Sequence, residues 1–298
     1  MPPSRQAYAL DEISARAAAA CARSAKLDAT VNHTAARPVW QFNRVIAYGQ
    51  SLSSGWEGWP ALSVTPRHDS LMIGDSVNGT SEDGGRWTPA GQAAFRPLVA
   101  TVMSIGATAA VLDAAEVGAL KPGTLALGET VLEGALDFWR GRQLALRAQR
   151  GAQRFAGRFV ASSCGVGGRS VEQLSLGASP ALFERPRMAV QAGRQLADAA
   201  GGSYGVAALL LLHGESNSVG RSGTAGRAEF FHLSAKLQAD FNREIVAAIS
   251  GQPQPPAVFT HQVGGLYSAT PTGCRSRWRR WTAPMACRTG SWWARPIR

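Results

Sequence analysis

Three short polar motifs contain the residue types that could do chemistry in this chain. They are Gly49-Gln50-Ser51, Gly167-Gly168-Arg169-Ser170 and His213-Gly214-Glu215-Ser216-Asn217. Acyl transfer needs a nucleophilic hydroxyl, together with hydrogen-bond donors aimed at the oxyanion that forms on attack. Ser51 is the candidate nucleophile, glycine lets a backbone N–H approach a ligand closely, and His213 or Asn217 offers a side-chain donor. Together the three motifs indicate a serine-dependent site for acyl transfer.

Each motif directly follows a short apolar segment that is typical of a strand buried on both faces of a parallel sheet. The segments are Asn43–Tyr48, Gly157–Ser162 and Val206–Leu212, and a fourth such segment is Ala257–Gln262. Taken singly, Gly-Gln-Ser is also a common turn sequence, and a glycine-rich loop could equally be structural or cradle a phosphate. However, loops that follow parallel strands share one edge of the sheet, so we expect the three motifs to meet there.

Longer segments alternate with these strands and are predicted to be helices. They are Pro89–Val102, Glu129–Arg150, Pro180–Ala199 and Arg227–Ile249. The last is the clearest, because its apolar residues recur every three or four positions and form one stripe. The alternation predicts a three-layer α/β/α sandwich with a mostly parallel, flavodoxin-like sheet. A loop-rich insertion from Gly55 to Gly91 holds three tryptophans that either contact a ligand or pack beneath the loop.

Composition narrows the classes of protein and partner. The chain has 298 residues, 45% hydrophobic and 17% charged, which suits one large α/β domain. No apolar run reaches about 18 residues and no signal peptide is visible, so we expect no membrane partner and, by default, a cytoplasmic location. The cysteines and histidines show no metal-ligand spacing, so neither a metal nor a cofactor is expected.

The net charge of +11 is concentrated at one end of the chain. Residues 274–298 hold seven arginines and no acidic residue, and 11 minus 7 leaves only +4 for residues 1–273. This distribution argues against a nucleic-acid-binding surface on the main body of the protein.

The three motifs, in this order and spacing, resemble those of the carbohydrate acetylesterase and sialate O-acetylesterase branch of the SGNH hydrolases. That branch shows Gly-Gln-Ser-Asn, a loop similar to Gly-Gly-Thr-Ser, and Gln- or His-Gly-Glu-Ser-Asp. The resemblance covers roughly residues 42–267, with Leu52 in place of the asparagine and Asn217 in place of the aspartate. It implies an esterase that removes acetyl groups from a small-molecule or carbohydrate ester.

The resemblance also implies a role for each matching residue. Ser51 would be the nucleophile, and the backbone N–H groups of Ser51 and Gly168 would form part of the oxyanion hole. The side-chain donor would be His213 or Asn217, and Glu215 would support the loop rather than take part in the chemistry.

The family's catalytic histidine has no counterpart in this sequence. In the SGNH hydrolases it follows an aspartate by three residues near the C-terminus, but this chain has no Asp-x-x-His and no histidine after His261. His261 falls inside the fourth predicted strand, where a packed histidine is a more natural interpretation than a substitute base.

The segment 274–298 is rich in Arg and Trp and lacks both helical and alternating periodicity. Our hypothesis is that the encoded sequence leaves the family's reading frame near residues 269–273, which would remove the catalytic Asp/His pair. Sequencing the gene across codons 265–298 tests it. The alternative interpretation is a genuine arm that binds nucleic acid or a membrane surface.

We therefore expect a helical leader or linker over residues 1–39, an incomplete esterase domain over 40–273 and a foreign tail over 274–298. The function predicted from the resemblance is that of a carboxylic-ester hydrolase. A non-catalytic α/β module that binds a glycan or another ligand is the alternative, because the expected base is missing.

Overall fold

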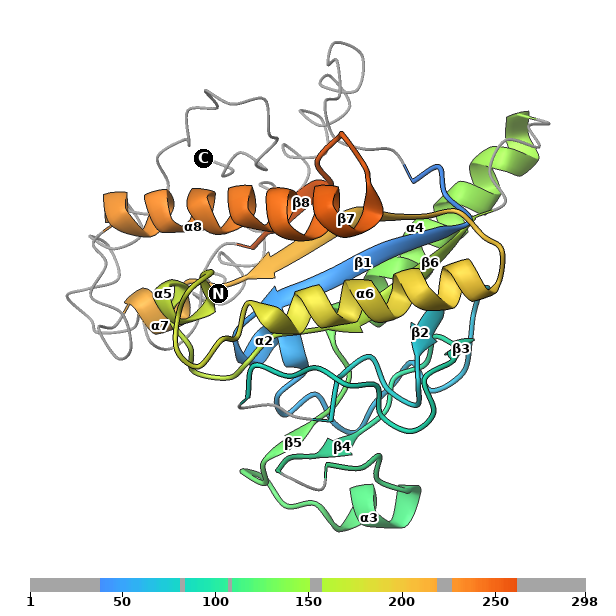
Figure 1. Ribbon diagram of the computed structural model, residues 1–298. Helices are drawn as coiled ribbons and strands as arrows, with labels where there is room; N and C mark the ends of the chain where they lie inside the picture. Colours follow the sequence, from blue (N-terminus) through green and yellow to red (C-terminus); the bar gives the residue numbers. More distant parts are fainter. Residues whose placement is uncertain (1–37, 81–83, 107–108, 151–156, 219–226, 262–298) are drawn as a thin grey trace, which may run out of the picture.

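A computed structural model describes residues 38–80, 84–106, 109–150, 157–218 and 227–261. Residues 1–37 of the predicted leader and the whole Arg/Trp-rich tail lie outside these residues, so the expectations for both stay predictions. Figure 1 shows one large twisted sheet with helices against it. Its strands are β1 (Phe42–Gly49), β2 (Leu71–Ile73), β3 (Phe95–Pro97), β6 (Arg158–Ser163), β7 (Tyr204–Leu212) and β8 (Ala257–Thr260).

The sheet is mostly parallel, and its strand order is β3-β2-β6-β1-β7-β8. Only β3 runs antiparallel to its neighbour, β2. The four strands predicted from the sequence are β1, β6, β7 and β8, and in chain order they lie as 2-1-3-4, which matches the start of a flavodoxin-type sheet. The predicted α/β fold class is confirmed.

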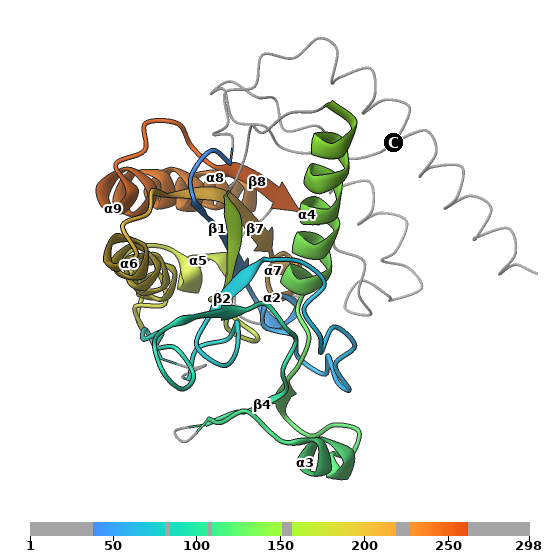
Figure 2. The ribbon, with the colours of Figure 1, turned by 90° about the vertical axis from the view of Figure 1, so that its right-hand side faces the viewer.

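Helices cover both faces of the sheet, as Figure 2 shows. The helices of the described residues are α2 (Ser51–Ser54), α3 (Ala114–Ala119), α4 (Val131–Arg150), α5 (Val171–Leu174), α6 (Glu184–Ala199), α7 (Glu215–Ser218), α8 (Arg227–Phe241), the π-helical η1 (Asn242–Ala247) and α9 (Ala248–Ser250). The helix α4 covers one face and α6 and α8 the other, whereas α3 lies away from the sheet. Alternate residues of β1 explain the layering. Ile46 and Tyr48 pack with α6 and α8, whereas Val45 and Ala47 pack with α4 on the other face.

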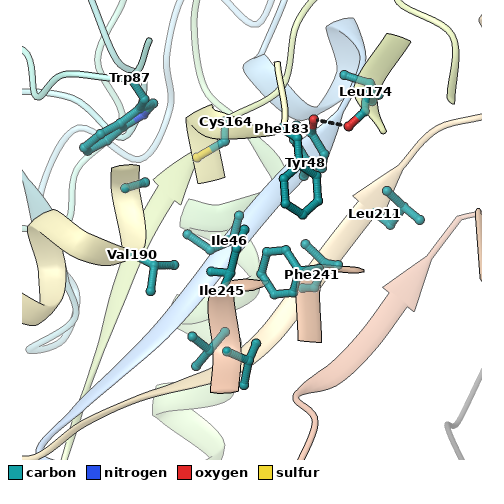
Figure 3. Close-up of a cluster of buried hydrophobic side chains, with 14 of the residues drawn as sticks. Ile46, Tyr48, Trp87, Cys164, Leu174, Phe183, Val190, Leu211, Phe241 and Ile245 are labelled. Atoms are coloured by element: carbon teal, nitrogen blue, oxygen red, sulfur yellow. Dashed lines mark hydrogen bonds between the residues drawn. The ribbon is translucent and has the colours of Figure 1, made fainter. Parts of the chain in front are cut away.

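The core on the α6/α8 face holds the β1 strand in position beneath the candidate nucleophile. In Figure 3, Ile46 and Tyr48 of β1 lie among side chains of α6, β7 and the helix that continues into η1. The Tyr48 hydroxyl donates a hydrogen bond of 2.7 Å to the Leu174 carbonyl at the end of α5. This bond joins the strand before Ser51 to the segment that follows the glycine-rich motif.

Two of the predicted helices need correction. Residues 89–102 contain no helix; they form loops and the short strand β3. Gly91 has φ +68°, and Pro97 offers no N–H at a position that would lie inside the helix, so this segment cannot sustain a helical hydrogen-bond pattern. The helix predicted from residue 180 begins at Glu184. The helix predicted over 227–249 is present as α8, η1 and α9 in succession.

A small second sheet extends from the insertion side of the molecule. It consists of β4 (Met103–Ser104) and β5 (Ala126–Leu127), with α3 between them in the chain. Trp56, from the loop after Ser51, packs against its apolar residues. Among the described residues, no helix is both long and apolar enough to cross a membrane.

Glu133 provides a test of how burial controls stability in α4. Its carboxylate is buried and accepts hydrogen bonds from the backbone N–H and the hydroxyl of Thr130. Burial raises the pKa of Glu133 from 4.5 to about 7 in spite of these bonds. The folded protein therefore keeps the Glu133 proton after the unfolded chain has lost it. The contribution of the protonated carboxyl to the free energy of unfolding is fully present below pH 4.5 and is lost as the pH rises to about 7.

We expect Glu133→Gln to remove this dependence and to raise the free energy of unfolding at pH 8 by up to about 3 kcal/mol. Urea denaturation at pH 4.5, 6 and 8 measures it. Glu116→Gln is the matched control, because Glu116 has the same capping position in α3 but is exposed. A Glu133→Gln variant that keeps the pH dependence of the wild type would contradict the prediction.

Candidate functional site

The three polar motifs follow β1, β6 and β7, and they meet at the carboxyl edge of the sheet. Ser51 begins α2 immediately after β1, and Gly168 lies in the loop between β6 and α5. His213 follows β7, and Glu215 begins α7. In a sheet of flavodoxin-type order, ligands bind where connections from neighbouring strands diverge, which here lies between β1 and β7.

The first motif contacts the third through the side chain of Gln50. Its Nε2 donates a hydrogen bond to Glu215, and its Oε1 accepts one from the backbone N–H of Ser216 at 3.1 Å. The Ser216 hydroxyl donates to the same oxygen. All the polar atoms of the Gln50 amide head thus have a partner in α7, which fixes the turn that carries Ser51.

The first motif contacts the loop just before the second motif through the backbone. The N–H of Val166 donates to the Gly49 carbonyl at 3.0 Å, and the N–H of Cys164 donates to the Ala47 carbonyl at 2.8 Å. These bonds continue the β1–β6 pairing past the end of β6. They bring the start of the glycine-rich loop alongside the residue that precedes Gln50.

The second motif contacts the third through two buried side chains. His213 Nε2 lies 2.9 Å from the Arg169 carbonyl oxygen, and the N–H of Val171 donates to Asn217 Oδ1 at 2.9 Å. Asn217 Nδ2 donates to Glu172 at 2.9 Å, which leaves its second hydrogen for another acceptor. The third motif therefore contacts both of the others, and the first contacts the residue just before the second, so the expectation that the three motifs meet at one edge is met.

The turn that carries Ser51 is stabilised by short-range contacts of α2. The hydroxyl of Ser53 donates to the Gln50 carbonyl, and the carbonyl of Ser53 accepts a hydrogen bond of 2.8 Å from Ser163. Asn78 donates to the Ser54 carbonyl at 3.2 Å from the insertion. Among the described residues, the Ser51 hydroxyl itself has no hydrogen-bond partner, and its side chain is half-buried.

Gly165 gives a direct test of how tightly this turn is packed. A Cβ at Gly165 would lie 1.7 Å from Ser53 Oγ and 3.2 Å from the Gln50 carbonyl oxygen. We expect Gly165→Ala to displace the Ser53 hydroxyl and to lower the free energy of unfolding by about 2 kcal/mol. Removing the hydroxyl as well, in Ser53→Ala/Gly165→Ala, relieves the closest contact.

The double variant should therefore be less destabilised than the sum of the two single variants, as a double-mutant cycle in urea measures. Strictly additive losses would contradict this account of the packing.

A pair formed by Glu215 and His261 lies beside this turn and was not expected from the sequence. His261 follows β8 directly instead of lying within it, and its Nε2 is 2.9 Å from Glu215 Oε1. Burial alone raises the pKa of Glu215, but the hydrogen bond and the electrostatic interaction with His261 outweigh it, so the pKa is lowered. Glu215 is therefore an ionised anchor between Gln50 and His261, consistent with the supporting role expected of it.

His213 is the most buried titratable side chain of the site. It is 4% exposed, and its ring stacks on Phe230 of α8 with centroids 5.7 Å apart. Burial lowers its pKa, although the hydrogen bond to the Arg169 carbonyl and the charge of Glu215 oppose this effect. His213 is thus kept in its neutral form near neutral pH.

The tryptophans of the insertion differ in their surroundings. Trp87 is 1% exposed, belongs to the main core and donates from Nε1 to the Ser163 carbonyl at 3.0 Å. Its role is structural, because it joins the insertion to the end of β6. Trp56 packs in the small cluster beside β4 and β5.

Two solved structures are similar to this chain in fold. One is the X-ray structure of the protein AT4G34215 from Arabidopsis thaliana, at 13% identity and a TM-score of 0.35, covering 73% of each chain. The other is the crystal structure of NanS, at 9% identity and a TM-score of 0.41, covering 82% of this chain and 74% of that one. No family model and no curated protein matches the chain.

Proposed function

We propose that the protein is a serine esterase that removes acetyl groups from O-acetylated carbohydrates. The observation that supports it best is the set of contacts that the three motifs and the residue just before the second motif make around the end of β1. Gln50 contacts Glu215 and Ser216, Gly49 contacts Val166, and His213 contacts Arg169. A nucleophile needs this kind of fixed surrounding, because misplacement of reacting atoms by about 1 Å can cost a factor of 100 in rate.

Ser51 is proposed to attack the acetyl carbonyl. Its position at the first residue of α2 leaves its hydroxyl at the sheet edge, and its backbone N–H and that of Gly168 are the proposed main-chain donors to the oxyanion. Gly168 adopts φ +71°, and a Cβ there would meet no atom within 4 Å, so the space beside it is open. An acyl group can therefore approach this part of the loop without steric hindrance from a side chain.

The proposed side-chain donor is Asn217 or His213. Asn217 retains one amide hydrogen after its bond to Glu172 and is held by Val171 at its oxygen. Glu215 is proposed to position the Ser51 turn through Gln50 and to take no direct part in bond making. Neither a metal nor a cofactor enters this proposal.

The carbohydrate part of the proposal rests on the resemblance of the three motifs to sialate and carbohydrate acetylesterases. It is tested by measuring the release of acetate from O-acetylated sialic acid and from acetylated xylan. p-Nitrophenyl acetate serves as an ester without a sugar, for comparison. Acetate release that disappears in Ser51→Ala supports the esterase. Binding of these sugars without any acetate release would instead support the non-catalytic binding module.

A further inference from the structure

The ring of His213 carries a buried nitrogen without a hydrogen-bond partner. Nε2 lies 2.9 Å from the Arg169 carbonyl oxygen, whereas Nδ1 is buried and has no partner among the described residues. A buried nitrogen of this kind lowers the stability of the folded protein, because it has lost its hydrogen bond to water. Its presence in a folded protein therefore calls for an explanation.

The contact with Arg169 determines which nitrogen carries the proton. A carbonyl oxygen can only accept, so Nε2 must be the N–H donor in the neutral ring. A neutral imidazole has a single N–H, so Nδ1 of His213 presents a lone pair. In this form His213 can accept a proton or a hydrogen bond at Nδ1, but it cannot donate one to an oxyanion.

The backbone pairing places His213 next to the turn that carries Ser51. The N–H of Gln50 donates to the Leu212 carbonyl at 3.1 Å, so His213 is beside the turn that begins with Gln50 and Ser51. β1 lies between β6 and β7, and Arg169 belongs to the loop after β6. His213 thus comes from the strand on one side of β1 and contacts the loop after the strand on the other side, with the Ser51 turn between them in the sheet order.

We propose that His213 Nδ1 is the proton acceptor for Ser51, which gives the protein a catalytic base without the missing Asp-x-x-His. This inference rests on the proposed esterase function. It assigns the side-chain donor of the oxyanion hole to Asn217, and it makes the Arg169 carbonyl the group that orients the imidazole, a role that a carboxylate has in the usual triad.

The proposed reaction balances with ester and water alone. Ser51 Oγ bonds to the acetyl carbon as its proton moves to His213 Nδ1, and the carbonyl electron pair moves to oxygen. The imidazolium then protonates the leaving sugar oxygen as the ester C–O bond breaks. Water attacks the acetyl-serine, gives a proton to Nδ1, and Ser51 leaves with that proton as acetate is released.

Charged groups around the ring allow a transient imidazolium. Burial has the largest effect and lowers the pKa of His213, and His261 acts in the same direction, whereas Glu215 and Glu172 favour the protonated form. The Arg169 carbonyl favours it as well, through the bond to Nε2–H. We therefore expect kcat/KM of the wild type to fall at acidic pH, as a base that must be neutral becomes protonated.

His213→Gln separates the two possible roles of this side chain. Glutamine keeps an N–H for the Arg169 carbonyl and can donate to an oxyanion, but it cannot accept a proton. We expect His213→Gln to lower kcat for p-nitrophenyl acetate by about 100-fold or more with little change in KM. His232→Gln, at an exposed position of α8 outside the three motifs, is the control and should keep the wild-type rate.

Three results would overturn the assignment. A His213→Gln rate within about tenfold of the wild type would make His213 a donor or a structural residue. Loss of activity in His261→Gln but not in His213→Gln would make His261 the base. Nitrogen NMR of the whole chain can locate the proton of the neutral His213 ring. A proton on Nδ1 would exclude His213 Nδ1 as the proton acceptor, irrespective of activity.

The failure of the two proposals can be told apart. A Ser51→Ala variant that hydrolyses esters as fast as the wild type rejects the esterase itself. An inactive Ser51→Ala beside a fully active His213→Gln rejects only the role of His213. Circular dichroism and thermal unfolding of each variant show whether a lost rate reflects a lost fold.

Discussion

Replacing Ser51 with alanine is expected to lower kcat/KM for p-nitrophenyl acetate and for the O-acetylated sugar by about 10⁴-fold or more. The Ser51 hydroxyl is the only group of the protein that is proposed to bond to the acetyl carbon, so its removal abolishes the acetyl-serine step. Ser51 is half-buried at the start of α2, and its hydroxyl has no hydrogen-bond partner in the described part of the chain. The variant should therefore fold as the wild type does.

Ser203→Ala is the matched control for Ser51→Ala. Ser203 is exposed at the opposite edge of the sheet, just before β7, where its hydroxyl accepts a hydrogen bond from the Gln41 N–H. We expect its rate to equal that of the wild type. A fluorophosphonate probe should label the wild type at Ser51, as mass spectrometry of the digested protein shows. Labelling at another serine would contradict the assignment of the nucleophile.

Gly49→Ala is expected to have the largest effect on stability of any substitution considered for the site. Gly49 adopts φ +143°, which disfavours any side chain, and a Cβ there would lie 2.0 Å from the Leu212 carbonyl oxygen. The clash is with backbone, so β1 and β7 must separate at the point where Gln50 bonds to Leu212. We expect the free energy of unfolding to fall by about 4 kcal/mol, as measured by urea denaturation.

Esterase activity should be lost in Gly49→Ala even under conditions where the variant remains folded, because the turn that carries Ser51 is displaced. Gly134→Ala is the control for this substitution. Gly134 lies in α4, and a Cβ there would meet no atom within 4 Å. Alanine should stabilise this helix by about 0.5–1 kcal/mol. A Gly49→Ala variant as stable as the wild type would show that the two strands can separate at little cost.

The strands of the sheet could be predicted from local sequence. β1, β6, β7 and β8 are short apolar runs, and each was predicted to within about two residues of its ends. The helix α4 and the succession α8, η1 and α9 were predicted for the same reason, since burial of one face requires a regular apolar pattern.

The region between β1 and α4 was predicted poorly. β2 and β3 are three residues each, and the segment 89–102 was predicted to be a helix. Strands this short have no measurable periodicity, and their pairing with each other and with β6 depends on residues distant in the chain. The insertion owes its structure to packing against the main sheet, as the buried Trp87 illustrates.

The sequence by itself determined which side chains are available at the sheet edge: a serine after β1, glycines after β6, and a histidine, a carboxylate and an amide after β7. Strand order and register alone decided that Gln50 anchors Glu215, that Glu215 holds His261, and that His213 contacts Arg169. These bonds join residues 165, 46 and 44 positions apart. Local propensity acts over a few residues, whereas such contacts form only when the whole sheet has assembled.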